Sequence, residues 1–383
     1  MKSTVYLDNA ATSWPKPEVV YQTIDNYNRH IGANPGRGSS SQTLAAGGVL
    51  LDTREILAQL FHITDISRIV FTKNITEALN IALKGYLNPG DHMITSSMEH
   101  NAVARPLSVL KNIGVEVTIV PCASDGSLYP PDVEKAWQNN TKMVALTSAS
   151  NVTGTIMPIK EIGYICRERG GLFLLDSAQG AGILPIDVEE QKIDILTFTG
   201  HKGLYGPQGT GGFYLRPGLE LRSLIEGGTG SLSEAIIQPE FLPDKFESGT
   251  PNTPGIAGLA AGVRFVLDTS LEAIRHHELQ LMAQLTDGLK DITGVTLYGP
   301  EDNLRRTSVL SLNLKGLECG ELSFALDERF GIITRSGLHC APLAHQTIGT
   351  LQQGTCRVSL SYFNSREEIT FFLEAMRKLS SEL

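Results

Sequence analysis

A lysine near the middle of the chain has the surroundings of a nucleophilic amine. The stretch Asp194-Ile-Leu-Thr-Phe-Thr-Gly-His-Lys-Gly203 runs from apolar residues into a Gly, then His201-Lys202, then a second Gly. The apolar run predicts a buried strand, and the glycines predict a sharp turn at its end. A lysine held there loses hydration, which lowers its pKa and favours amine chemistry. Lys202 taken alone leaves open a solvent-exposed lysine in a Gly-rich loop.

A carboxylate ends another apolar segment, Gly171–Asp176. Burying Asp176 is costly unless it meets a cation or a hydrogen-bond donor. It is therefore either a cap for the following turn or a partner for a protonated ring nitrogen of a ligand. Gln179, three residues later, is placed to face the same ligand.

Phosphate-binding groups accompany these residues. Thr199 and His201 offer hydroxyl and imidazole donors beside Lys202, and Thr76 lies at the start of an expected helix, where backbone N–H groups bind phosphate. A lysine for imine formation, an acid for a pyridinium nitrogen and donors for phosphate together match pyridoxal 5'-phosphate.

Strands and helices alternate around these residues. Strands are expected at 68–72, 91–95, 115–120, 142–147, 171–176, 193–198 and 210–215, and helices at 74–83, 101–112, 131–138 and 159–169. This order predicts an α/β fold with a mainly parallel sheet covered by helices on both faces. Ligands of such sheets bind at the carboxyl ends of the strands, where His100, Asn151, Asp176 and Lys202 would gather.

The pattern changes after the turn-rich strip Phe246–Pro254. Helices at 255–267, 272–291, 321–330 and from 365 mix with strands at 295–298, 308–313 and 354–361. We expect a large α/β domain over residues 14–255 and a small α+β domain formed by 1–13 with 256–383. The Gly-rich segment 32–41 is either a flexible connector or a loop that closes over a site.

Composition narrows the functional classes. The 383 residues carry a net charge of −9, with 41% hydrophobic and 19% charged residues, which is typical of a globular protein and argues against nucleic-acid binding. We expect no membrane span, because no apolar run approaches about 18 residues, and no secretory signal. The five scattered cysteines favour a reducing cytoplasm over a disulfide framework or a metal site.

Ordered motifs along nearly the whole chain resemble the class V aminotransferase superfamily, and most closely the cysteine desulfurases and selenocysteine lyases of the SUF type. The matching segments are Leu7-Asp-Asn-Ala-Ala-Thr12, Glu99-His-Asn101, Ser150-Asn-Val-Thr-Gly154, Asp176-Ser-Ala-Gln179, Phe198-Thr-Gly-His-Lys-Gly203, Gly206-Pro-Gln-Gly209, Phe246-Glu-Ser-Gly-Thr-Pro-Asn252 and Arg335-Ser-Gly-Leu-His-Cys-Ala341. The resemblance implies a fold-type I enzyme that depends on pyridoxal phosphate, with a mainly parallel seven-stranded sheet and a smaller α+β domain.

The resemblance also implies roles for individual residues. Lys202 would hold the cofactor covalently, His100 would stack on its ring and act in catalysis, and Asp176 and Gln179 would contact its ring nitrogen and hydroxyl. Three groups would bind its phosphate, and Thr250 would reach the phosphate of a second subunit, which implies a homodimer. The phosphate-binding residues are Thr76, Thr199 and His201. Asn151 would contact the cofactor and also, with Arg335 and Arg357, the substrate carboxylate.

Cys340 decides which reaction the resemblance implies. A cysteine alone is most often a small buried apolar residue, but Cys340 lies in the last motif, flanked by Arg335 and His339, which favour a thiolate. The implied reaction converts L-cysteine to L-alanine, with a persulfide on Cys340 that an acceptor protein takes up for sulfur metabolism such as iron–sulfur cluster assembly. A selenocysteine lyase, another class V lyase, an epimerase or a transaminase remain alternatives, as does a nonenzymatic α/β binding protein or sulfur-transfer scaffold.

The chain departs from the SUF-type pattern at two places. No His follows Arg37-Gly38, and residue 338 is Leu where those enzymes often carry a second His. Both positions lie where substrate or acceptor would be handled, so the choice between cysteine and selenocysteine, the acceptor and the pathway stay open.

Overall fold

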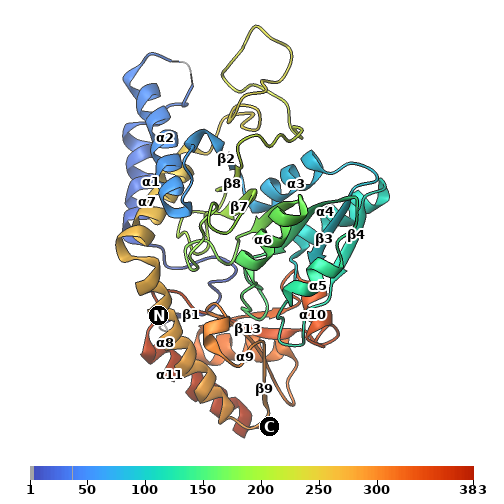
Figure 1. Ribbon diagram of the computed structural model, residues 1–383. Helices are drawn as coiled ribbons and strands as arrows, with labels where there is room; N and C mark the ends of the chain where they lie inside the picture. Colours follow the sequence, from blue (N-terminus) through green and yellow to red (C-terminus); the bar gives the residue numbers. More distant parts are fainter. Residues whose placement is uncertain (1–3, 37) are drawn as a thin grey trace.

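A seven-stranded sheet forms the centre of the computed structural model, which describes residues 4–36 and 38–383 (Figure 1). Its strand order is β2-β8-β7-β6-β5-β3-β4. The strands are β2 (Ile69–Thr72), β3 (His92–Ser96), β4 (Glu116–Val120), β5 (Thr141–Thr147), β6 (Leu172–Asp176), β7 (Ile195–Thr199) and β8 (Gly211–Leu215). All neighbours are parallel except β8, which runs antiparallel to both β2 and β7. The expected α/β fold with a mainly parallel seven-stranded sheet is confirmed.

Helices cover both faces of this sheet, and its central strands are therefore buried on both sides. Every residue of β6 and β7 is buried, and two separate apolar clusters pack on the two faces. The helices of this part are α1 (Glu18–His30), α2 (Ser41–Phe61), α3 (Ile75–Tyr86), α4 (Asn101–Asn112), α5 (Pro130–Lys135), α6 (Ile159–Arg169) and α7 (Thr253–Thr269), with a 3-10 turn η1 (Ile66–Arg68).

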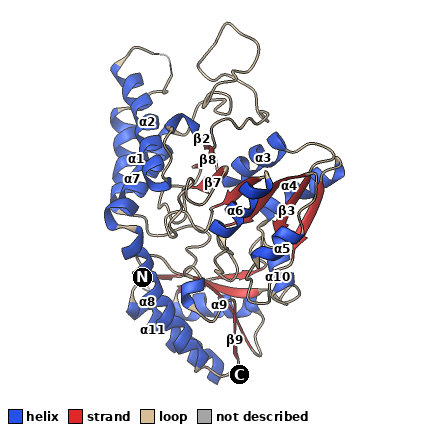
Figure 2. Ribbon diagram, in the orientation of Figure 1, coloured by secondary structure: helices blue, strands red, loops and turns tan. Residues whose placement is uncertain are grey.

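A smaller α+β unit lies below the large sheet in Figures 1 and 2. Its four-stranded sheet has the order β12-β13-β10-β9. The elements are β9 (Val295–Tyr298), β10 (Val309–Leu314), β12 (Arg335–Gly337), β13 (Thr355–Ser359), α8 (Leu271–Lys290), α9 (Cys319–Phe330), α10 (Pro342–Thr347) and α11 (Arg366–Ser381), with a 3-10 turn η2 (Asn303–Arg305). This unit has its own apolar core. The domain limits at residues 13 and 255 stay a prediction.

The N-terminal segment ties the two parts together. Strand β1 (Val5–Tyr6) pairs in parallel with β11 (Ile332–Ile333), and Asp8 forms a parallel bridge to Ser359. The chain then crosses to the large sheet. Strands of two or three residues, such as β1, β11 and β12, and the six-residue helix α10 had not been expected, because such short elements leave no periodic pattern in a sequence.

The edge of the large sheet gathers the ends of its strands. Because β2, β3, β5, β6 and β7 run in the same direction, the residues that follow each of them lie along one edge.

In the described part of the chain, no helix is long and apolar enough to cross a membrane.

Candidate active site

Lys202 lies in a tight turn that two glycines make possible. A Cβ at Gly200 would lie 2.1 Å from the Thr210 hydroxyl oxygen, and a Cβ at Gly203 would lie 2.5 Å from the Ala181 carbonyl oxygen. No other residue type fits without displacing its neighbours. The turn therefore places Lys202 directly at the carboxyl end of the buried strand β7.

The N-terminal segment holds this turn through one carbonyl group. The main-chain oxygen of His201 accepts hydrogen bonds from Ser13 N at 3.0 Å, Thr12 Oγ1 at 3.1 Å, Ser13 Oγ at 3.2 Å and Lys16 Nζ at 3.3 Å. Four donors on one oxygen fix the peptide that precedes Lys202. The sequence predicts no role for Lys16, for which the only signal is its proximity to the Leu7–Thr12 motif.

The surroundings of Lys202 favour the neutral form of its amine. Burial lowers its pKa to about 8, and the Asp176 carboxylate opposes this shift, while the cations Arg357 and Arg335 add to it. Burial also raises the pKa of Asp176, whose carboxylate accepts a hydrogen bond from Ala178 N at 2.9 Å and is favoured by Lys202. Lys202 and Asp176 are therefore electrostatic neighbours, as the sequence had suggested.

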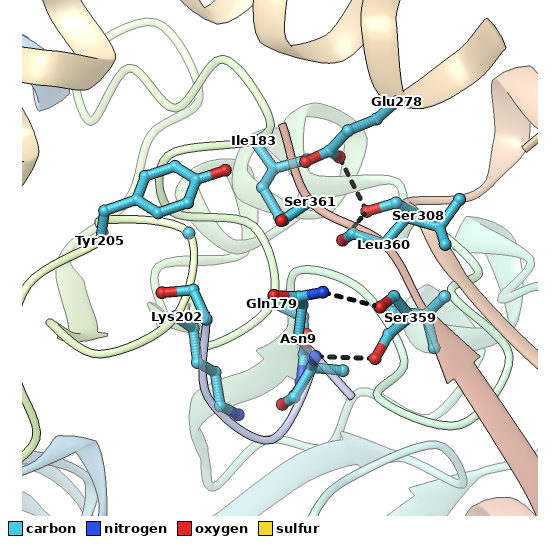
Figure 3. A pocket seen from close by; sticks show the side chains of 14 residues that line it. Asn9, Gln179, Ile183, Lys202, Tyr205, Glu278, Ser308, Ser359, Leu360 and Ser361 are labelled. Atoms are coloured by element: carbon cyan, nitrogen blue, oxygen red, sulfur yellow. Dashed lines mark hydrogen bonds between the residues drawn. The ribbon is translucent and has the colours of Figure 1, made fainter. Parts of the chain in front are cut away.

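Gln179 lies on the same side of the pocket as Lys202 (Figure 3). Its Nε2 donates to the Ala10 carbonyl oxygen at 3.1 Å. Its side-chain oxygen has no hydrogen-bond partner among the described residues, so it can meet a hydroxyl group. The amine of Lys202 points away from the buried Glu278, whose carboxylate is engaged with Ser308. Glu278 is thus not one of the groups around the lysine amine.

The three predicted phosphate ligands lie at the end of β7, in the turn after it and in the first turn of α3. Thr76 is exposed in the first turn of the 12-residue helix α3, and the helix N-cap is Asn74, which accepts from Glu77 N. Thr199 is buried at the end of β7. The Nδ1 atom of His201 is buried and has no hydrogen-bond partner among the described residues, and burial lowers the pKa of this imidazole to about 4. A buried nitrogen without a partner is the kind of atom that a bound ligand satisfies.

His100 presents a neutral imidazole to the site. It is the N-cap of α4, and its Nδ1 accepts a hydrogen bond from Ala102 N at 3.0 Å. In the neutral ring the proton therefore sits on Nε2. Burial lowers the pKa of His100 to about 4, and the charges of Lys202, Arg335 and Arg357 act in the same direction.

Glu99, just before His100, had not been singled out for a role. It is fully buried, its Oε1 accepts from Ser96 Oγ at 2.6 Å and from Thr147 N at 3.2 Å, and burial raises its pKa to about 8. Its Oε2 finds no partner within the described residues. These contacts join the ends of β3 and β5 and support the position of His100.

Cys340 lies in the segment between β12 and α10, and its side chain is exposed. Its main-chain oxygen accepts from Asn101 N at 2.8 Å, next to His100 in the chain. The Nη2 atom of Arg335 lies 4.0 Å from the Cys340 sulfur. This segment of the small unit is thereby fastened to the edge of the large sheet.

The expectation that His339 favours a Cys340 thiolate is wrong. Burial lowers the pKa of His339 to about 2, so the ring is neutral. Its Nε2 contacts Thr355 Oγ1 at 3.1 Å. Arg335 is therefore the cation of this motif that stands near the sulfur.

Arg357 and Asn151 lie together under this segment. The Nη1 of Arg357 donates to the Asn151 carbonyl oxygen at 3.0 Å, and Asn151 Nδ2 donates to the His339 carbonyl oxygen at 2.8 Å. The Arg357 side chain is completely buried and forms an ion pair with Asp8 at 2.6 Å. Arg335 pairs with Arg357 across β12 and β13.

Thr250 does not line the pocket that contains Lys202. It is exposed and lines a different pocket with Thr72, Lys73 and Asn252. Asn34, Pro35 and Gly36 of the Gly-rich segment line the same pocket, while Arg37 of that segment lies outside the described residues.

The residues present fit pyridoxal phosphate. A lysine with a lowered pKa, a buried carboxylate for a ring nitrogen, a neutral imidazole and a buried His201 nitrogen without a partner among the described residues are groups that this cofactor requires. Within residues 4–36 and 38–383, no group of three or more His, Cys, Asp or Glu side chains is arranged to hold a metal ion.

The fold and this group of residues define a class of enzyme. The family model described as aminotransferase class-V matches residues 5–372, and the chain belongs to this family.

Several relatives are known by name. The chain is 34% identical to a probable cysteine desulfurase of Methanothermobacter thermautotrophicus, over 99% of this chain and 96% of the relative. It is 33% identical to a cysteine desulfurase of Pectobacterium atrosepticum, over 98% and 92%. Among solved structures, the apo cysteine desulfurase of Thermococcus onnurineus superposes with a TM-score of 0.93 at 33% identity, covering 99% of this chain and 95% of that one. The cysteine desulfurase CsdA of Escherichia coli, in an S-sulfonic acid form, gives a TM-score of 0.89 at 28% identity, covering 99% and 95%.

Proposed function

We propose that this protein is a pyridoxal-phosphate-dependent cysteine desulfurase that converts L-cysteine to L-alanine and leaves the sulfur as a persulfide on Cys340. The observation that carries the proposal is the bond from Asn101 N to the Cys340 carbonyl oxygen at 2.8 Å. It joins the main chain of Cys340, whose side chain is exposed, to the residue that follows His100. The relatives that match this chain over nearly their whole length are named cysteine desulfurases, which supports the same reaction.

The cofactor would be held by the residues around Lys202. Lys202 would bind it covalently, Asp176 would meet its ring nitrogen, Gln179 its hydroxyl group, and His100 would stack on its ring. Its phosphate would be bound by Thr76, Thr199 and His201. Pyridoxal phosphate, when bound, supplies an electron sink for the bonds at the substrate's α- and β-carbons.

The protein's own groups would then carry protons and sulfur. Arg357, Arg335 and Asn151 would orient the substrate carboxylate, because a planar guanidinium matches a carboxylate. Once freed by the substrate amine, the Lys202 amine, neutral above about pH 8, would accept the α-proton and return it before alanine leaves.

Sulfur transfer would follow at Cys340. Its thiolate attacks the substrate sulfur, a sulfur–sulfur bond forms, and the carbon–sulfur bond breaks with its electron pair left on the substrate carbon. That carbon takes up a proton and is reduced, while the two sulfurs are oxidised to the persulfide level. His100, whose neutral ring carries its proton on Nε2, would steer such a proton by hydrogen bonding. An acceptor protein then removes the outer sulfur.

A product assay tests the reaction. The purified holoenzyme is given L-cysteine or L-selenocysteine with a reductant, and alanine and sulfide or selenide are measured. We expect equimolar alanine and sulfide from cysteine, and Cys340→Ser to lose nearly all of the sulfide. Desulfuration at the wild-type rate by Cys340→Ser would refute the persulfide route, and turnover of selenocysteine alone would make the protein a selenocysteine lyase.

We also propose that the enzyme is a homodimer that acts in the cytoplasm. Thr250 faces a pocket away from Lys202, and the neighbouring segment exposes Ile225, Ile236 and Ile237. Exposed apolar side chains in the segment next to Thr250, a predicted phosphate ligand, support the proposal that a second copy of the chain covers them. The five free thiols support a reducing compartment.

A further inference from the structure

The guanidinium proposed to bind substrate already has a carboxylate partner within the chain. Arg357 Nη2 donates to Asp8 Oδ1 at 2.6 Å, and Nη1 donates to the Asn151 carbonyl oxygen. The Arg357 side chain is 0% exposed and that of Asp8 is 16% exposed. The ion pair thus reaches solvent only through its acidic member.

The backbone holds the Asp8 carboxylate in place. Asp8 bridges to Ser359 two residues after Arg357 on the same strand, and its carbonyl oxygen accepts from Ala11 N at 3.1 Å and Thr12 N at 3.4 Å. The segment then continues to the His201 carbonyl group. Asp8 therefore belongs to a segment whose main chain is held by hydrogen bonds, so its contact with Arg357 does not depend on a mobile loop.

The charges around the Asp8–Arg357 ion pair explain why the buried Arg357 needs a carboxylate partner. Arg335 and Arg357 each act on Lys202, and Asp8 is a carboxylate that opposes them there. A buried guanidinium without a counter-charge is strongly destabilising. When no substrate is present, Asp8 supplies that counter-charge.

We propose that Asp8 is an internal competitor for the substrate carboxylate, and that it sets the affinity of the site for carboxylates. Asp8 holds Arg357 in the free enzyme, and an incoming carboxylate must share the guanidinium with it. Two carboxylates on one cation repel each other, so the second binds more weakly than it would to a free guanidinium. The inference rests on the proposed role of Arg357 in carboxylate binding.

Asp8→Asn tests the inference in the holoenzyme. Asn keeps the side-chain shape and an oxygen acceptor for Nη2 but removes the charge. The probe is propionate, which has a carboxylate and no amine, and its inhibition constant against L-cysteine turnover is measured. We expect the inhibition constant to fall by about tenfold. An unchanged or raised constant would overturn the proposal.

Three further variants make the result specific. Asp8→Glu retains the charge and is expected to keep the constant within about twofold of the wild type. Asp25→Asn removes a carboxylate from an exposed ion pair with Arg29 and should leave the constant unchanged. Melting temperatures of all variants are compared, and Asp8→Ser replaces Asp8→Asn if the latter does not fold.

Arg357→Lys separates this inference from the proposed function. If propionate inhibits that variant as it does the wild type, Arg357 does not bind carboxylates and its proposed role fails, whatever Asp8 does. If inhibition weakens in Arg357→Lys but Asp8→Asn leaves it unchanged, only the competitor role of Asp8 fails.

Discussion

At the residue scale, Lys202 shows which of two opposing effects dominates. Burial and the charges of Arg335 and Arg357 favour the neutral amine, while Asp176 and Asp8 favour the ammonium form. The pKa is lowered to about 8, so burial and the two cations prevail. A lysine that is partly deprotonated near neutral pH is suited both to hold a carbonyl cofactor and to accept a proton.

The lowered pKa predicts how cofactor capture depends on pH. The ordinary pKa of the amine is 10.5 and that of Lys202 is about 8, so its neutral fraction rises as pH increases through about 8. After removal of the cofactor, the rate at which pyridoxal phosphate restores the visible absorbance band should rise with a midpoint near pH 8. Asp176→Asn removes a charge that raises this pKa, so its midpoint should move lower. A midpoint near 10.5 in the wild-type protein would contradict this account.

At the element scale, the segment that carries Cys340 owes its position to bonds from other elements. His339 and Cys340 are consecutive residues in the left-handed region, with φ of 49° and 58°. Asn151 Nδ2 and Asn101 N bind their two carbonyl oxygens, both at 2.8 Å. Such a backbone persists only where its surroundings hold it.

The side chain of His339 adds a further bond to this segment. Thr355 Oγ1 donates to Ser311 Oγ at 3.0 Å, and Ser311 Oγ donates to the Val152 carbonyl oxygen at 2.7 Å. The Thr355 hydroxyl donates its only proton to Ser311, so it can only accept a hydrogen bond from His339. The Nε2 atom of His339 is therefore the donor in this contact. His339 is therefore a positioning residue for Cys340.

Replacing His339 tests this positioning role. His339→Ala loses the donor and tolerates the left-handed conformation poorly, which costs about 1–2 kcal/mol, so persulfide formation should slow by about tenfold. His339→Asn tolerates that conformation and retains a side-chain donor, so it should recover most of the rate. Exchange of the substrate α-proton with solvent, which relies on Lys202, should be unchanged in both. Equal rates for Ala and Asn would argue against the positioning role.

Most of the large sheet and the residues at its edge follow from sequence pattern. Helix α6 matches the expected range 159–169, and β6 lies within one residue of its expected start. Periodic apolar runs and the rule for parallel sheets are enough to place Asp176 and Lys202 near each other. The helix α10 and the pairing of Asp8 with Arg357 could not be predicted, because the first is a single short turn segment and the second joins residues 349 positions apart. The neutral state of His339 likewise depends on burial, which three-dimensional packing decides.

At the scale of the whole molecule, the site is assembled from both parts of the chain. Lys202 and Asp176 come from the large sheet, while Arg357 and Cys340 come from the smaller unit, and Asp8 belongs to the segment between them. The long loop between β8 and α7, at the top of Figure 1, carries Thr250 and projects away from the sheet. In the proposed homodimer, this loop would bring Thr250 to the cofactor phosphate of the other subunit.

The exposed end of this loop gives a test of the dimer. Ile236 is fully exposed and Ile237 is 75% exposed. Charges at both positions, Ile236→Asp with Ile237→Asp, would have to be buried against a second copy at a cost of several kcal/mol. We expect sedimentation to show a dimer for the wild-type protein and a shift toward monomer for the double variant, with weaker cofactor binding. The exposed Leu304, changed to Asp, is the control and should remain dimeric. A wild-type protein that sediments as a monomer would refute the homodimer.

The central claim is that sulfur from cysteine comes to rest on Cys340, and mass spectrometry tests it most directly. The holoenzyme is mixed with L-cysteine without a reductant, treated with an alkylating reagent, and digested. The peptide that contains Cys340 should be heavier by one sulfur atom, in an amount that matches the alanine released in the first turnover, and the peptides with the other four cysteines should be unmodified. Release of alanine with an unmodified Cys340 peptide, or with the extra sulfur on another cysteine, would contradict the account.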